Sequence, residues 1–131
     1  MLKKTIHYVD YNGVERSEDH YFNLNEAELA KKEMGVAGGY AEMLKRIIQS
    51  QDGPTIMKIF NEFIVDSYGI KSLDGKRFEK SPEISKAFEQ SEAYNVLFME
   101  LVTNAGAASD FINAIIPKKK ASAQVPAPTT V

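Results

Sequence analysis

The chain has 131 residues, of which 44% are hydrophobic and 26% charged, with a formal net charge of −2 at pH 7, as is ordinary for one globular domain. The absence of cysteine excludes disulfides and thiolate metal sites, and no apolar run approaches the length that spans a bilayer. The three lysines 118–120 are the only charges after Pro117, so residues 1–117 carry −5, which argues against a nucleic-acid surface.

The first part of the chain, about residues 3–22, reads as a β-hairpin. Residues 3–9 alternate and are rich in strand-forming side chains, and Asn12-Gly13 favours a tight turn because both residues tolerate positive φ. The return strand to Phe22 is unusually polar, which suits an exposed edge. Since a two-stranded hairpin is marginal alone, it must pack on helices or extend a sheet from another chain.

Three helical segments follow. Asn25 and Glu28 form a variant of the capping box, and Gly35 with Gly38-Gly39 marks the end of this short helix and a second break. Asp52-Gly53-Pro54 separates the next two helices, and Gly69 stands at the usual C-terminal position of the second. Their apolar faces consist of Tyr40, Met43, Leu44, Ile47 and Ile48 in the first, and Ile56, Ile59, Phe60, Phe63, Ile64 and Tyr68 in the second.

Residues 70–80 read as a loop in which Asp74-Gly75 makes a tight turn, with a very small second hairpin as an alternative. Ser81-Pro82-Glu83 then opens another helix, with a cap, a proline and an acid in order.

Residues 88–117 are the most apolar and most helix-patterned part of the chain. On a helical wheel a broad core-facing sector leaves Val96 and Met99 outside it, among polar residues. The pattern restarts after Asn104 and stops at Pro117, which predicts two helices. The sector of the first helix holds Ala93, Tyr94, Leu97, Phe98, Leu101 and Val102, and that of the second holds Ala105, Ala107, Ala108, Phe111, Ile112, Ile115 and Ile116.

The expected fold is mainly α, a compact bundle of about five or six helices with an N-terminal β-hairpin. Residues 1–117 would form this single domain. Residues 118–131 contain two prolines and little to bury, so we expect a flexible C-terminal tail.

No catalytic, cofactor or metal site is predicted, because no motif places reactive side chains at a useful spacing. His7 and His20 could share a face of the hairpin with a nearby acid, depending on the register, but solvent-facing strand residues are the simpler interpretation. A small basic cluster around Phe78 is better explained as a solvated loop than as a nucleic-acid contact; it consists of Lys71, Lys76, Arg77 and Lys80.

The order of several phrases resembles the tail assembly chaperones of long-tailed, siphovirus-type bacteriophages or prophages of Gram-positive bacteria. The resemblance spans residues 6–117. It is carried by YVDYNGVERSEDHYFNLNEAEL, GGYAEMLKRIIQSQDGPTIMKIFNEFI, YGIKSLDGKRFEKS and FEQSEAYNVLFMELVTNAGAASDFINAIIP.

The resemblance implies a non-catalytic protein that acts in the cytoplasm of the bacterial host during virion assembly. Such chaperones bind the tape-measure protein, keep it soluble and help to recruit tail-tube proteins. Self-association is also expected, whereas nucleic acid and membrane are not expected partners. Many phages of this kind make a longer product by a ribosomal frameshift, and Lys118-Lys119-Lys120 is compatible with such a site, although an ordinary basic tail explains it equally well.

An amphipathic helical client requires an apolar surface on a helical scaffold. We predict that Tyr94, Val96, Met99, Phe111 and Ile115 provide it, with plain packing as the alternative for each. Val96 and Met99 are the better two, because they lie off the core sector and methionine adapts to varied partners.

Three other functions remain as alternatives at this point. A structural head or tail protein that oligomerises would be present in purified particles at a fixed copy number. A small regulatory nucleic-acid-binding protein would bind DNA in a salt-sensitive way. An enzyme would need a buried acid pair in a closed pocket.

Overall fold

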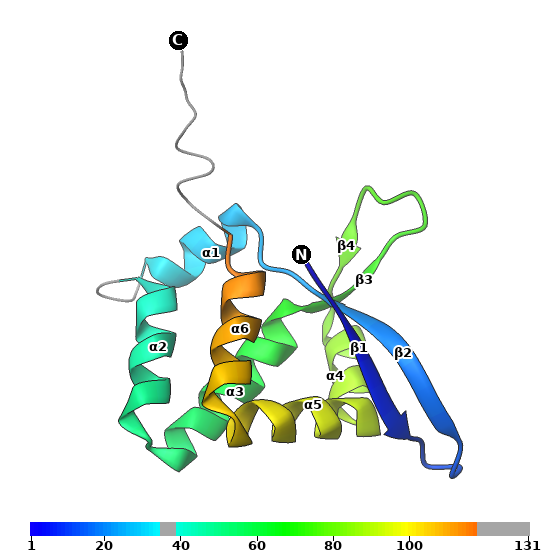
Figure 1. Cartoon of the computed structure of the whole chain (residues 1–131). Helices are drawn as coiled ribbons and strands as arrows, with labels where there is room; N and C mark the ends of the chain where they lie inside the picture. Colours follow the sequence, from blue (N-terminus) through cyan, green and yellow to red (C-terminus); the bar gives the residue numbers. More distant parts are fainter. Residues whose placement is uncertain (35–38, 118–131) are drawn as a thin grey trace.

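A computed structural model describes residues 1–34 and 39–117, and Figure 1 shows how they are arranged. These residues form a small sheet and a set of helices that cover one side of it. The strands are β1 (Leu2–Val9), β2 (Glu15–Phe22), β3 (Tyr68–Lys71) and β4 (Phe78–Glu79). The helices are α1 (Glu26–Glu33), α2 (Tyr40–Ser50), α3 (Gly53–Ser67), α4 (Pro82–Glu89), α5 (Glu92–Thr103) and α6 (Ala105–Ile115).

The predicted fold class is confirmed: the described part of the chain is mainly helical, with six helices after an N-terminal antiparallel hairpin. The predicted break between the last two helices is also confirmed, at Asn104. Gly35 and Gly38, expected at a helix end and a break, and the expected flexible tail 118–131 lie outside the described residues.

The hairpin belongs to a larger sheet than the sequence predicted. Its strands follow the order β1-β2-β3-β4, all antiparallel where they pair. β2 pairs with β1 over eight residues, but with β3 only through Tyr21 opposite Gly69 and Phe22 opposite Tyr68. The remainder of β2, residues 15–20, therefore has no strand on its outer side in the part of the chain that is described, in agreement with the predicted polar edge.

The alternative of a second small hairpin in residues 70–80 is the correct one. β3 and β4 pair through Ile70 opposite Glu79, and Gly75 makes the turn with a φ of 75°. The prediction that Gly69 ends a helix in the usual way is wrong, because α3 ends at Ser67 and Gly69 lies inside β3. The residue that follows α3, Tyr68, has an extended backbone conformation, so the chain passes directly from the helix into the sheet.

Polar caps begin most of the helices where the sequence predicted them. Asn25 and Glu28 form a complete capping box, in which the Asn25 side chain accepts from the Glu28 amide at 2.8 Å and Glu28 accepts from the Asn25 amide at 2.9 Å. Asp52 and Ser81 cap α3 and α4, each with a proline in the first turn. Asn104 ends α5 and caps α6, so the two helices are joined through one residue.

The core lies between the inner face of the sheet and the helices, with Phe22 at its centre. The Phe22 side chain is fully buried, and its ring lies 5.3 Å from that of Phe111, 5.7 Å from that of Tyr68 and 5.8 Å from that of Phe88. The hairpin is thus fixed to both the middle and the end of the chain, as the marginal stability of an isolated hairpin requires.

Candidate partner-binding surface

Helix α5 has a buried side and an exposed apolar side. Ala93, Leu97 and Leu101 are buried, as the helical wheel predicted. On the opposite side, Val96 and Met99 are 37% and 47% exposed. Residues three or four positions apart are neighbours on a helix, so the three buried side chains form one side of α5 and pack it against the core. Val96 and Met99 are neighbours for the same reason, and their side of the helix faces solvent.

Two acids border Val96 on the same stripe of α5. Glu92 and Glu100 lie four residues before and after it. Tyr11 donates to Glu92 at 2.9 Å, and Lys4 forms an ion pair with Glu100 at 3.2 Å. These contacts place this stripe of α5 alongside β1, from the turn of the hairpin to its first residues.

The other three predicted residues lie in different surroundings. Phe111 and Ile115 are 4% and 2% exposed, on the side of α6 that faces the core. Tyr94 is half-buried, its hydroxyl donates to Asn61, and its ring stacks on that of Phe98 at 5.6 Å. Burial, with a contribution from Glu89, raises the pKa of the Tyr94 phenol to about 12. Of the five residues predicted to meet a partner, Val96 and Met99 are therefore the two that the fold leaves exposed.

Sequence reasoning missed other exposed apolar side chains. Leu73, in the turn between β3 and β4, is fully exposed, and Ile70 and Met57 are 48% and 50% exposed. Ile70 could have been identified only from its pairing in β3, since the sequence has no periodic pattern there.

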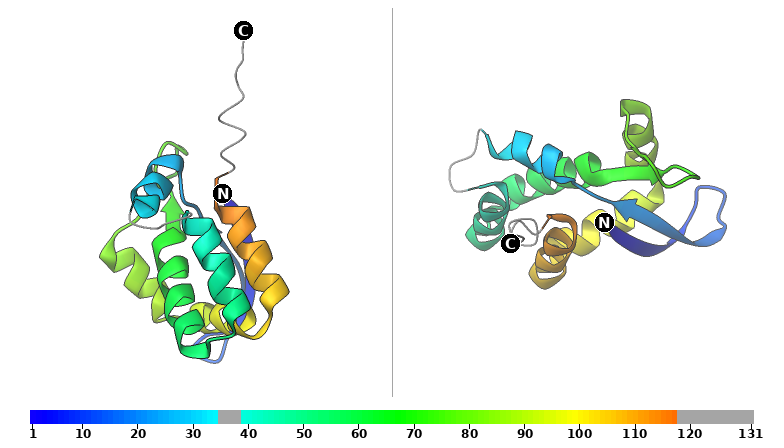
Figure 2. Two further views of the ribbon diagram at one scale, coloured as in Figure 1. Left: turned by 90° about the vertical axis from the view of Figure 1, so that its left-hand side faces the viewer. Right: turned by 90° about the horizontal axis from the view of Figure 1, so that it is seen from above.

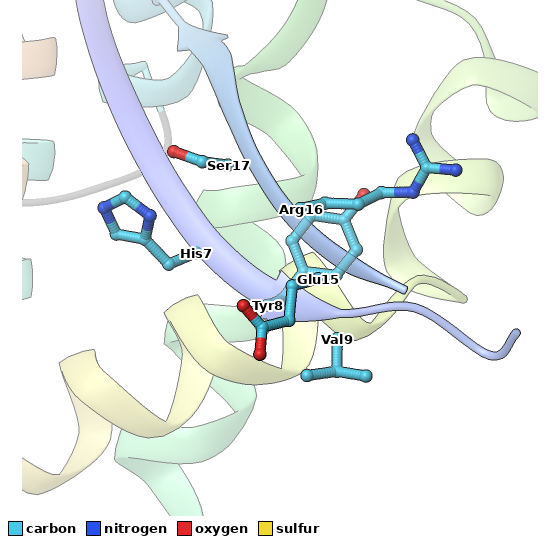
Figure 3. Close-up of a pocket in the computed structure, with 6 residues that line it drawn as sticks. All are labelled: His7, Tyr8, Val9, Glu15, Arg16 and Ser17. Carbon is cyan, nitrogen blue, oxygen red and sulfur yellow. The ribbon is translucent and has the colours of Figure 1, made fainter. Parts of the chain in front are cut away.

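The end of the hairpin forms a shallow pocket, which Figure 3 shows. The register places His7, Val9, Glu15 and Ser17 on one face of the hairpin, with Tyr8 and Arg16 on the other. Arg16 is held at 2.6 Å by Asp10, whose pKa it lowers. The pocket is open and its polar groups do not converge, so it has no arrangement suited to catalysis.

The two histidines lie on opposite faces of the hairpin. His7 is opposite Ser17 and exposed, whereas His20 is opposite Lys4 and turned inward. The alternative in which both share a face is therefore wrong. Within residues 1–34 and 39–117, no group of three or more histidines and acids is placed to hold a metal ion.

The basic cluster near Phe78 is largely used inside the protein. Arg77 pairs with Glu79 at 2.9 Å, and Lys80 with Glu28 at 2.7 Å. Lys71 lies over the ring of Tyr21, with its Nζ 4.9 Å from the centroid. Lys71 thus links the second hairpin to β2 and Lys80 links it to α1, whereas the Arg77–Glu79 pair lies within the hairpin itself.

A second cleft, between the sheet and α4, contains His20. The ring lies 5.2 Å from that of Phe88, and its Nε2 is buried with no hydrogen-bond partner among the described residues. Burial lowers the pKa of His20, although Glu18 and Asp19 act in the opposite direction. The cleft is lined by Tyr8, His20, Tyr68, Ile70, Glu83, Ile84, Ala87, Phe88 and Ser91.

We expect acid to destabilise the protein partly through His20. As the pH falls below about 6.5, the unfolded chain binds a proton at this residue, which the folded state takes up only at lower pH. The free energy of unfolding should therefore decrease as the pH falls through about 6.5, the ordinary pKa of histidine, and urea denaturation measures it. The decrease should be smaller in His20→Gln than in wild type. An equal decrease in the two proteins would contradict this role.

No helix in the described part of the chain is long and apolar enough to cross a membrane. A sequence model of the family described as phage tail assembly chaperones matches residues 1–127. No curated protein and no solved structure matches the chain significantly.

Proposed function

Because the chain belongs to the phage tail assembly chaperones, we propose that it binds the tape-measure protein, keeps it soluble and helps to recruit tail-tube subunits in the cytoplasm of the bacterial host. A chaperone of this kind needs no catalytic site. The phrases of the sequence that resemble chaperones from phages of Gram-positive bacteria support a host of that group.

The observation that carries the proposal is the exposed apolar pair on α5. Val96 and Met99 stand on a helix that three buried residues hold in place, so an amphipathic client helix can pack on them without rearranging the core. A pair of this size gives weak binding for each copy. Many copies along one long client would supply avidity and still allow stepwise displacement.

Acids and a base surround this pair and limit what binds there. Glu92 and Glu100 border Val96, and Lys4 lies beside Glu100. A client segment that offers an apolar face with basic residues at its margins would match these charges. Tyr94, Phe111 and Ile115 support the surface from inside, since they pack α5 and α6 against the rest of the fold.

The test is co-expression of this chain with the tape-measure protein of the same phage. We expect the wild-type chain to keep the client soluble, and a pull-down with light scattering to find many copies bound. Met99→Glu should weaken binding about tenfold or more for each copy, because burial of a methionine side chain contributes about 1.5–3 kcal/mol.

Met57→Glu is the matched control. Met57 has nearly the same exposure, 50% against 47%, but lies on α3. Equal solubility of the client with Met99→Glu and with wild type would exclude the α5 surface. A client that stays insoluble while this chain elutes alone would contradict the chaperone function, and fixed copies of the chain in purified particles would favour a structural virion protein.

A further inference from the structure

The outer edge of β1 is an unpaired strand whose backbone can be followed residue by residue. The Asp10 amide donates to the Val14 carbonyl at 2.9 Å, so this pair faces into the hairpin. In an antiparallel ladder the facing pairs alternate, which makes Tyr8 opposite Arg16 the next inward pair. The residues between them turn their N–H and C=O groups away from the partner strand. On β1 these are Lys3, Thr5, His7 and Val9.

The hydrogen bonds on the outer edge of β2 confirm which residues face outward. By the same alternation Glu15, Ser17, Asp19, Tyr21 and Asn23 face away from β1. The Asn23 amide donates to the Ser67 carbonyl at 2.7 Å, and Tyr21 pairs with Gly69 in β3, as the alternation requires.

The free groups of β1 are open to another chain. β1 is an edge strand of the described sheet, and the side chains of Lys3, Thr5, His7 and Val9 are all exposed. None of these four residues forms a backbone hydrogen bond outside the ladder within the described part of the chain. Eight residues in regular register are a long edge by the standards of natural sheets.

The two free edges of the hairpin differ in their protection. The outward-facing residues of the open part of β2 include two acids, Glu15 and Asp19, charges that discourage further pairing. The outward-facing residues of β1 include only one charge, Lys3, and neither a proline nor a bulge interrupts the strand. Charged side chains thus protect the β2 edge from further strand pairing, whereas the β1 edge lacks such protection.

We propose that β1 pairs antiparallel with β1 of a second copy of this chain, around a two-fold axis near Ile6. Thr5 then lies opposite His7 of the second copy, and Lys3 opposite its Val9. This register joins residues whose free backbone groups face each other and makes one continuous sheet from two copies. The inference does not depend on the proposed binding of the tape-measure protein.

Charge complementarity favours a second copy as the occupant. Lys3 stands at one end of the edge, exposed and without an ion-pair partner among the described residues. At the other end Glu15 lies opposite Val9 on the same outer face and is likewise exposed and unpaired in the described structure. Antiparallel pairing brings each Lys3 next to the Val9–Glu15 pair of the other copy, so two attractive Lys–Glu contacts form. A parallel arrangement would place lysine beside lysine.

The first test uses proline at two facing positions. His7 and Ser17 are opposite each other, and each turns its amide outward, away from the other strand. His7→Pro removes a donor from the β1 edge, and Ser17→Pro removes the equivalent donor from the β2 edge, while neither breaks the ladder of the hairpin. Analytical ultracentrifugation over a range of concentrations should show a dimer for wild type and Ser17→Pro, and a monomer for His7→Pro.

The second test keeps the backbone intact. Lys3→Glu and Glu15→Lys should each weaken the dimer about tenfold, because each turns two attractive contacts into repulsive ones. An equimolar mixture of the two variants should recover the wild-type affinity, since both contacts are attractive again in the mixed dimer. Lys3 and Glu15 cannot restore each other within one chain, because they lie at opposite ends of the hairpin.

Three outcomes would overturn the inference: a wild-type chain that is monomeric at all concentrations, a dimer that both prolines leave unchanged, or single charge variants whose mixture gains no affinity. Pairing of the β1 edge with a strand of another tail protein, and not with itself, would appear as a monomeric chain whose binding of that protein is lost in His7→Pro alone. Circular dichroism of each variant ensures that the compared proteins are folded.

Discussion

Replacing Phe22 by alanine should cost about 3–5 kcal/mol of stability, the range for removal of a buried aromatic side chain. Phe22 is fully buried and its ring contacts those of Tyr68, Phe88 and Phe111, which come from β3, α4 and α6. Since small domains have about 5–15 kcal/mol in total, this one change should remove a large share of the stability. Urea denaturation followed by circular dichroism measures the loss.

Tyr11→Ala is the control for this prediction. Tyr11 is an aromatic residue of the same hairpin, but it is 76% exposed and gives up only a surface hydrogen bond to Glu92. Its loss should change the free energy of unfolding by about 0.5 kcal/mol or less. Similar losses for the two variants would show that the hairpin is not fixed to the core through Phe22.

Gly69→Ala should destabilise the protein by about 1–3 kcal/mol through steric overlap. A Cβ at Gly69 would stand 2.6 Å from Cε2 of Phe78 and 2.9 Å from the carbonyl oxygen of Glu79. The Phe78 ring can turn aside, but the Glu79 carbonyl belongs to the backbone of β4, which pairs with β3. The strands must therefore move apart, and this should weaken the pairing of Gly69 with Tyr21 as well.

Gly53→Ala provides the matched comparison. A Cβ at Gly53 meets nothing within 4 Å, and the residue begins α3, where alanine is favourable. This variant should be as stable as wild type or more stable by about 0.4–1 kcal/mol. If thermal denaturation gave the same midpoint for Gly69→Ala and Gly53→Ala, the close approach of β3 and β4 would be contradicted.

The parts of the fold that depend on neighbouring residues could be predicted from the sequence. The side chains of Asn25, Ser81 and Asn104 each accept a hydrogen bond from an amide only three residues away, so these helix starts were predicted correctly. The turn at Asn12-Gly13 was also placed correctly, but of these two residues only Gly13 adopts a positive φ, of 79°.

The parts that depend on distant residues could not be predicted. Nothing near Gly69 in the sequence indicates that it pairs with Tyr21, and a glycine after a helical repeat ordinarily ends the helix. A local pattern likewise cannot place Phe22 at the centre of the core, because its neighbours there come from three later elements.

The candidate surface was predicted to the extent that one helical wheel allows. The wheel separated Val96 and Met99 from the buried side of α5, and the structure exposes both. For Phe111 and Ile115 the wheel gave the apolar face of α6 but not its direction, which packing against Phe22 and Phe63 decides. That Val96 lies alongside an open sheet edge follows only from the contacts of Glu92 and Glu100 with the hairpin.

The contact between Phe22 and Phe111 has a consequence for the timing of folding during synthesis. The hairpin is made first, but the ring that covers Phe22 from α6 is made near the end of the described chain. Such non-local contacts slow folding, because a long loop must close before they form. The nascent chain therefore leaves the ribosome with its first strands still uncovered, and the native core can close only after α6 has emerged.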